Sequence, residues 1–190
     1  MSVVQADGRR QRSERSRQAI IDAALELMQE GVLAPTAQGI SERAGVGIRS
    51  FFRHFADMEA VVAAVDDHIR ATYEALFTGG DRTGDLAVRI ERAITRRGRA
   101  FDDLSNLILA TQANLRYSSN LRHNYARCQR GLRRDLESWA PEIAVLEPAS
   151  REAVDAIASF EFWHRLRVHQ RLSIKSATEL VIQLLLGILS

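Results

Sequence analysis

The stretch of sequence that decides the fold is residues 36–55, which read TAQGISERAGVGIRSFFRHF. Thr36 can cap the start of a short helix, because its side chain can accept a hydrogen bond from a backbone N–H of the first turn. Gly45 can end that helix, because glycine takes the left-handed conformation at no steric cost. A second short helix is expected at about 47–55. The stretch therefore predicts two short helices joined by a tight turn, a helix-turn-helix.

Helical patterns flank this motif on both sides. Apolar residues recur at 3.6-residue spacing from Ser13 to a stop signal at Gly31, and again from the cap residue Asp57 to the break at Gly79. Residues 1–12 contain several arginines and few apolar side chains, so they bury too little surface to offset their ordering entropy. We expect a flexible basic arm there.

The rest of the chain also predicts helices, since no run of residues alternates with the period of a strand. Helices are expected at about 85–100, 102–113, 119–139 and 149–170. A final helix is opened by SATE at residues 176–179, which has the pattern of a capping box. About nine helices in total place the chain in the all-α class, with a three-helix N-terminal unit followed by a larger α-helical domain.

Composition excludes several classes of protein. The chain has 190 residues, 46% of them hydrophobic, with 3 prolines and 11 glycines, which is typical of a helical globular protein and not of a disordered one. Its single cysteine, Cys128, can form neither an intramolecular disulfide nor a thiolate metal cluster. The apolar stretch 180–189 is far shorter than the roughly 18 residues of a membrane span, and no signal peptide is visible. We expect a cytoplasmic protein that does not enter a membrane.

Charge is concentrated locally, although the net charge of +2 is too small to indicate nucleic-acid binding. Residues 9–17 hold five arginines against one glutamate, and residues 36–55 hold three arginines against one glutamate. The second short helix carries Arg49, Ser50 and Arg53 on its outer side, which suits the major groove of DNA. We therefore expect the helix-turn-helix to bind DNA.

At residues 40–46, ISERAGV, and 51–55, FFRHF, the sequence resembles the DNA-binding signature of TetR-family transcriptional repressors. The resemblance covers residues 13–77. A weaker likeness at 163–167, WHRLR, is similar to the dimer-forming end of many members. The resemblance implies a homodimer that binds a near-palindromic double-stranded DNA operator and releases it when a small-molecule effector enters the C-terminal domain. It implies no cofactor and no enzymatic activity.

The resemblance also implies which residues contact DNA. Thr36 and Gln38 begin the first short helix, the bracing helix, which steadies the motif on the DNA backbone. Residues 48–50 lie on the second, the recognition helix. Phe52 and His54 stand where the family contacts phosphates. The expected DNA-binding residues are Thr36, Gln38, Gly47, Ile48, Arg49, Ser50, Phe52, Arg53 and His54. The N-terminal arginines could reach the minor groove.

Several positions depart from the family pattern. Phe52 stands where a tyrosine hydroxyl usually bonds a phosphate, Met58 where lysine is common, and Gly47 where a serine usually caps the helix. Arg49 stands where glycine is frequent and could contact a base or a phosphate. Phe51 and Phe55, four residues apart, are expected in the core. A second possibility is that Phe52 is also a core residue, which would leave DNA recognition to Ile48, Arg49 and Ser50.

The last helix is apolar around most of its circumference over 180–189, and one layer of neighbours would not cover it. Self-association with the long helix at 149–170 would form a four-helix interface. The expected interface residues are Phe160, Leu166, Val181, Leu184, Leu185 and Ile188. The alternative is that the last helix is fully buried inside one chain, but few other segments remain that could cover it.

Large apolar and scattered polar side chains in the middle of the chain are typical of a ligand cavity, although each is also common in a core. The expected ligand-binding residues are Phe101, Gln112, Asn114, Tyr117, His123, Trp139 and Trp163. The chain thus divides into a basic arm (1–12), a DNA-binding domain (13–57), a connecting helix (58–80) and a regulatory, ligand-binding and dimerisation domain (81–190).

Two other functions are alternatives. The first is a DNA-binding regulator that answers to a protein partner or to no ligand. The second and more distant is an α-helical enzyme, but the sequence shows no nucleophile–base pair and no paired metal motif.

Overall fold

The computed structural model describes residues 3–190, and side chains at residue 8 and from residue 10 onward. Within these residues there are ten α-helices and no strand, which confirms the all-α class. The helices form two compact units. Unit 1 comprises the described residues up to 71 together with 106–124, and unit 2 comprises 72–105 and 125–190. No helix among the described residues is long and apolar enough to cross a membrane.

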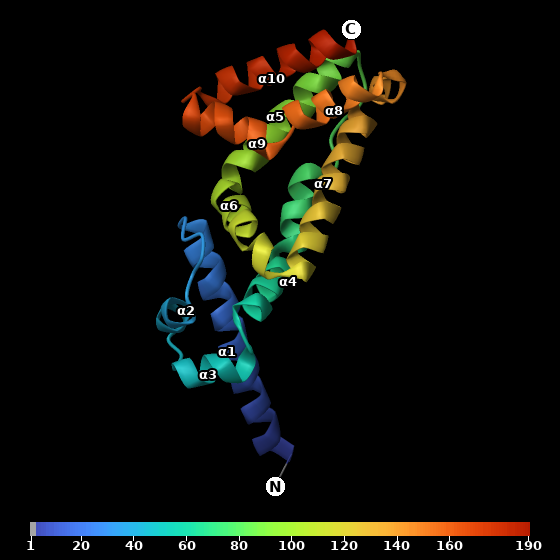
Figure 1. Ribbon diagram of the computed structural model, residues 1–190. Helices are drawn as coiled ribbons and strands as arrows, with labels where there is room; N and C mark the ends of the chain where they lie inside the picture. The colour runs from blue at the N-terminus through green and yellow to red at the C-terminus, as the bar shows by residue number, and fades with distance from the viewer. Residues whose placement is uncertain (1–2) are drawn as a thin grey trace. The chain divides into compact units, whose positions relative to one another are not determined.

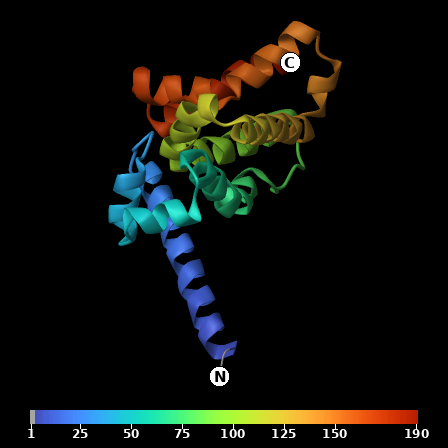
Figure 2. The ribbon, with the colours of Figure 1, turned by 60° about the horizontal axis from the view of Figure 1, so that its bottom comes forward.

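Unit 1 contains the helix-turn-helix. Its elements are α1 (Val3–Gln29), α2 (Ala37–Ala44), α3 (Ile48–His54), the first part of α4 (Met58–Phe77), most of α6 (Ser105–Asn114), the 3-10 turn η1 (Leu115–Tyr117) and the start of α7 (Ser119–Trp139). Helices α2 and α3 pack on α1 (Figure 2). Their core consists of fully buried apolar residues, one or two from each helix: Ile20, Ala24, Ile40, Phe51 and Val61.

The local signals that the sequence offered in this unit are confirmed. Thr36 Oγ1 accepts a hydrogen bond from Gly39 N at 3.1 Å and caps α2. Gly45 ends α2 with φ 65°, in the left-handed region that favours glycine. Asp57 Oδ1 accepts from Ala60 N at 2.8 Å at the start of α4.

The structure differs from the flexible arm that the sequence predicts for residues 1–12. Helix α1 begins at Val3, so residues 3–12 continue the helix, while residues 1 and 2 lie outside the described residues. Arg12 Nε donates to the Gly8 carbonyl at 3.1 Å, and Ser16 Oγ donates to the Arg12 carbonyl at 3.1 Å. Long charged side chains are good helix formers that need no burial, so a shortage of apolar residues does not by itself end a helix.

Unit 2 is the larger helical domain. It contains α5 (Leu86–Asp103), most of α7, the 3-10 turn η2 (Pro141–Val145), α8 (Pro148–Ile157), α9 (Phe160–His164), the π-helix η3 (Arg165–His169) and α10 (Ile174–Leu189). Helix α10 lies along α5 (Figure 1). Between them are buried Ile90 and Ile94 of α5 and Val181 and Leu185 of α10.

The single helix expected at 149–170 is wrong, because the chain breaks between α8 and α9. Ser159 Oγ accepts from Phe162 N at 3.2 Å and caps a new helix. Arg97 on α5, only 5% exposed, donates to the Ala158 carbonyl at the break and to the Leu132 carbonyl, at 3.4 and 2.7 Å. A carbonyl bonded to a buried guanidinium is satisfied without continuing the helix.

The capping box expected at residues 176–179 is also wrong. Helix α10 begins at Ile174, and its cap is Ser173, whose Oγ accepts from Ser176 N at 3.0 Å. The serine–threonine–glutamate pattern therefore lies inside the first turns of the helix.

The structure corrects most of the expected dimer interface. Phe160, Leu166, Val181 and Leu185 are between 0% and 3% exposed within one chain, so they cannot reach a partner in this fold. Helix α5 packs along α10 and provides this cover. Of the expected residues, Leu184 is 37% exposed and Ile188 is half-buried.

Candidate nucleic-acid interface

Helix α3 turns one face into the core of unit 1 and the other to solvent. Phe51 and Phe55 are 0% and 3% exposed, which confirms their expected place in the core. Phe52 is 54% exposed, which excludes the alternative that it is a core residue, and Ile48 is 37% exposed. The outer face of α3 therefore presents apolar as well as charged side chains.

The two arginines of this face differ in their surroundings. Arg53 Nη2 donates to Ser50 Oγ at 2.8 Å, so its guanidinium is held along the helix. Arg49 is exposed, and no hydrogen bond or ion pair from any other described residue engages its guanidinium. Arg49 is thus free to meet a base edge or a phosphate.

His54, at the end of α3, is less accessible than expected for a phosphate contact. Its side chain is half-buried, and Nε2 is buried without a hydrogen-bond partner among the described residues. Burial lowers the pKa of His54 below 6.5, and the nearby charges of Arg53 and Arg17 lower it further. A neutral ring is therefore favoured at neutral pH.

The bracing helix α2 presents Thr36 and Gln38 at its exposed start. Thr36 Oγ1 is the acceptor of the helix cap, so its hydroxyl hydrogen remains available to donate. Gln38 Nε2 donates to Glu42 Oε1 at 2.6 Å along the helix. Gly47 precedes α3 and, without a side chain, gives it no cap hydrogen bond.

Arg43 has a role that its place in the sequence does not reveal. Its Nη1 and Nη2 atoms each lie 2.8 Å from an oxygen of Glu30, and Nη1 lies 3.4 Å from Glu26 Oε2. These hydrogen bonds raise the pKa of Arg43 and lower that of Glu30. The arginine therefore links α2 to α1 and helps to position the motif.

The residues expected to bind a ligand are divided between the two units. Gln112, Asn114, Tyr117 and His123 lie in unit 1, and Asn114 Nδ2 donates to the Leu33 and Ala110 carbonyls at 2.9 and 2.7 Å. As ligand-binding residues, these four stay predictions.

The three remaining members of that set are core residues of unit 2. Phe101, Trp139 and Trp163 are 2%, 2% and 3% exposed. Trp163 Nε1 donates to Asp102 Oδ1 at 2.8 Å. The cavity beside Phe101 and Trp163 has a volume of about 10 Å³, which is room for one water molecule at most. Close packing accounts for these three residues.

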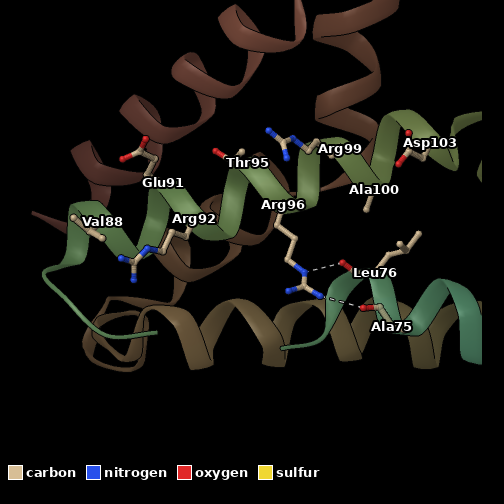
Figure 3. A pocket seen from close by; sticks show the side chains of 10 residues that line it. All are labelled: Ala75, Leu76, Val88, Glu91, Arg92, Thr95, Arg96, Arg99, Ala100 and Asp103. Carbon is tan, nitrogen blue, oxygen red and sulfur yellow. Dashed lines mark hydrogen bonds between the residues drawn. The ribbon is translucent and has the colours of Figure 1, made fainter. Parts of the chain in front are cut away.

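A larger cleft of about 770 Å³ lies along α5, beside the end of α4 (Figure 3). Its walls combine apolar side chains with three arginines and two acidic residues: Ala75, Leu76, Val88, Glu91, Arg92, Thr95, Arg96, Arg99, Ala100 and Asp103. None of the expected ligand-binding residues is among them. Arginines spaced at 92, 96 and 99 on one helix are the sequence signal that could have pointed to it.

The three arginines of the cleft are engaged to different degrees. Arg96 donates to the carbonyls of Leu76, Ala75 and Thr78, so it caps the C-terminus of α4. Arg92 pairs with Asp81 at 2.9 Å. Arg99 is exposed, and among the described residues nothing bonds to its guanidinium. The described residues also contain no group of three or more histidine, cysteine or acidic side chains that could hold a metal ion.

Comparison with known proteins agrees with this geometry. Residues 20–65 match the family described as bacterial regulatory proteins, tetR family. No significant match to a curated protein was found.

Several solved structures share the fold. A tetR-family transcriptional regulator from Streptomyces coelicolor is 20% identical with a TM-score of 0.67, over 92% of this chain and 79% of that one. A transcriptional regulator from Rhodococcus is 17% identical with a TM-score of 0.64, over 92% and 96%. The multidrug binding protein EbrR, solved with ethidium, is 18% identical with a TM-score of 0.57, over 89% and 98%.

At these identities the likenesses show the fold, while the family match falls on the helix-turn-helix itself. Residues 20–65 therefore match the family described as bacterial regulatory proteins, tetR family, and the chain shares the fold of TetR-family transcriptional regulators.

Proposed function

We propose that the protein is a homodimeric repressor that binds a near-palindromic operator and releases it when a small molecule binds to unit 2. The observation that carries the DNA-binding part is the exposed outer face of α3, with an unpaired Arg49, supported by the buried core of the helix-turn-helix. A short exposed helix mounted in this way fits the major groove of B-DNA. The proposed contact residues are Thr36, Gln38, Gly47, Ile48, Arg49, Ser50, Phe52, Arg53 and His54.

In a dimer with twofold symmetry, the two α3 helices would read half-sites about one duplex turn apart, ~34–36 Å. Selection from random duplexes should therefore enrich an inverted repeat. Because arginines contribute phosphate contacts, binding should weaken steeply as salt rises. Enrichment of no inverted repeat would contradict the proposal.

Arg49→Ala tests how the recognition helix reads its site. If Arg49 bonds a base edge, the variant should lose on the order of 1–3 kcal/mol of binding free energy at the preferred operator and discriminate less between sites. If Arg49 bonds a phosphate, affinity should fall equally for all sequences and the salt slope should decrease by about one. Unchanged binding would remove Arg49 from the interface.

The proposal of a ligand rests on the cleft along α5. A volume of about 770 Å³ lies within the range of small-molecule sites, and the walls combine apolar side chains with charged groups that could orient a ligand. EbrR, which shares the fold, is a multidrug binding protein solved with ethidium. By analogy, the ethidium bound to EbrR supports a regulator of this fold that responds to a small molecule.

A thermal-shift screen of small molecules tests this proposal, since a ligand that binds only the native state raises the melting temperature. A hit should lose its effect in Arg99→Ala, which alters the cleft. It should keep its effect in Arg130→Ala, an exposed arginine of unit 2 outside the cleft. The hit should also release the operator in a gel shift. Full release by a compound insensitive to Arg99→Ala would move the ligand site elsewhere.

A further inference from the structure

Two apolar side chains share the outer face of the recognition helix. Ile48 and Phe52 are four residues apart on α3, so they lie on the same side of the helix. They are 37% and 54% exposed, whereas Phe51 and Phe55 are buried. The rings of Phe52 and buried Phe51 pack in a T-shaped arrangement, with a centroid distance of 5.2 Å and an interplanar angle of 78°. The exposed part of Phe52 is therefore held in place.

The charges beside this apolar pair indicate what covers it. Arg49 and Arg53 also lie four residues apart and form an adjacent cationic stripe on the same short helix. A cationic stripe attracts a polyanion, and the sugar–phosphate backbone of DNA provides one. Phe52 has no donor for a phosphate oxygen, and Ile48 has none either. Within the major groove, the apolar group that such side chains can contact is the C5 methyl of thymine.

We propose that Phe52 and Ile48 determine sequence preference by packing against thymine methyl groups in each half-site of the operator. The proposal rests on the proposed DNA-binding function and adds the chemistry of the readout. Arg49 then supplies the polar part of recognition, and the apolar pair selects A·T over G·C pairs at neighbouring positions.

Removal of single methyl groups from the DNA gives a direct test. First, an operator is selected with the wild-type protein. Each thymine of a half-site is then replaced in turn by deoxyuridine, which keeps the base pairing and lacks the methyl group. At one or two positions, wild-type affinity should fall about three- to fivefold, the change expected for one methyl group buried from water.

The protein variant completes a double-mutant cycle. Phe52→Ala should bind the thymine operator more weakly than wild type and should lose nothing further when the sensitive thymine becomes deoxyuridine, because the contact is already absent. Phe52→Leu, which keeps an apolar side chain, should retain part of the sensitivity. Arg49→Ala should weaken binding and keep the full sensitivity to deoxyuridine. Equal melting temperatures of wild type and Phe52→Ala check that the fold is intact.

The outcomes separate the readout from the function itself. If an operator is selected and no deoxyuridine substitution changes wild-type binding, thymine readout is wrong and DNA binding stands. If Phe52→Ala loses the same factor on thymine and deoxyuridine operators, Phe52 contacts sugar or phosphate groups instead. If no operator is selected, the proposed function fails and the readout with it.

Discussion

His54 is the residue of the recognition helix whose charge responds to mild acid. Its folded-state pKa lies below the usual 6.5, chiefly because burial disfavours the charged ring. As pH falls through 6.5, His54 is protonated in the unfolded chain before it is protonated in the folded chain. The free energy of unfolding therefore decreases. We expect urea midpoints of wild type to fall between pH 7.5 and pH 5.5 by more than those of His54→Gln. Parallel pH dependence in the two proteins would contradict this assignment.

Gly98 on α5 allows the closest approach of an aromatic ring in unit 2. A Cβ at this position would lie 2.5 Å from Trp163 Cη2, and the Trp163 ring is fixed by its hydrogen bond to Asp102. Gly98→Ala should therefore destabilise the protein by about 1–3 kcal/mol in urea unfolding, the usual cost of overpacking.

Gly131→Ala is the matched control for this substitution. Gly131 is also helical, but a Cβ there would meet no atom within 4 Å. Alanine should stabilise the helix by roughly 0.5–1 kcal/mol. If both substitutions stabilise the protein, the Trp163 ring moves easily and the packing argument at Gly98 is wrong.

Residues with local signals could be predicted from the sequence, and residues fixed by distant partners could not. Thr36, Gly45 and the pair Phe51 and Phe55 follow from capping, backbone conformation and helical spacing within a few positions. Arg43 depends on Glu30, which lies 13 residues away on another helix. Its position in the sequence gives no sign of this partner.

At the scale of whole elements, helix breaks were the hardest feature to predict. Apolar spacing runs through residues 149–170 without a proline or glycine, so a continuous helix is the expected reading. The break is held by Arg97, which lies 61 residues from Ala158 in the sequence. Such a break depends on tertiary structure. The recognition motif, in contrast, was predictable because Thr36 and Gly45 mark the start and the end of its first helix.

The start of α10 offers a test of the corrected cap. In the structure Ser173 Oγ accepts from Ser176 N, while the Ser176 hydroxyl lies within hydrogen-bond distance of the Ser173 hydroxyl, at 2.9 Å. Ser173→Ala should cost about 1 kcal/mol of unfolding free energy. Ser176→Ala should cost a few tenths at most. The reverse order in urea unfolding would restore the capping box that the sequence indicated.

At the scale of the whole molecule, the remaining question is which surface of α10 meets a second copy. Ala177, Val181 and Leu185 form the stripe that is buried within the chain, since α10 packs along α5. Leu180, Leu184 and Ile188 form a neighbouring stripe at the same four-residue spacing that keeps solvent contact. Three apolar residues in a row on one partly exposed face are typical of an interface. We therefore place the proposed dimer contact on this second stripe.

Leu184→Asp tests that placement. A charge buried in an interface without a partner is costly, so the variant should sediment as a monomer at concentrations where wild type is a dimer. Operator affinity should fall by more than tenfold, because one half-site no longer adds its binding energy to the other. The melting temperature should fall only by the part that association contributes, because Leu184 is already 37% exposed in the single chain and the fold itself stays intact.

Two further variants separate association from folding. Leu185→Asp places a charge at a position that is 0% exposed inside the chain, so it should unfold the protein rather than split a dimer. Val145→Asp changes a residue that is 87% exposed in η2 and should leave both the dimer and operator binding intact. A dimer that survives Leu184→Asp with full operator affinity would place the interface on another surface, because a buried aspartate at the centre of the contact is not compatible with unchanged association.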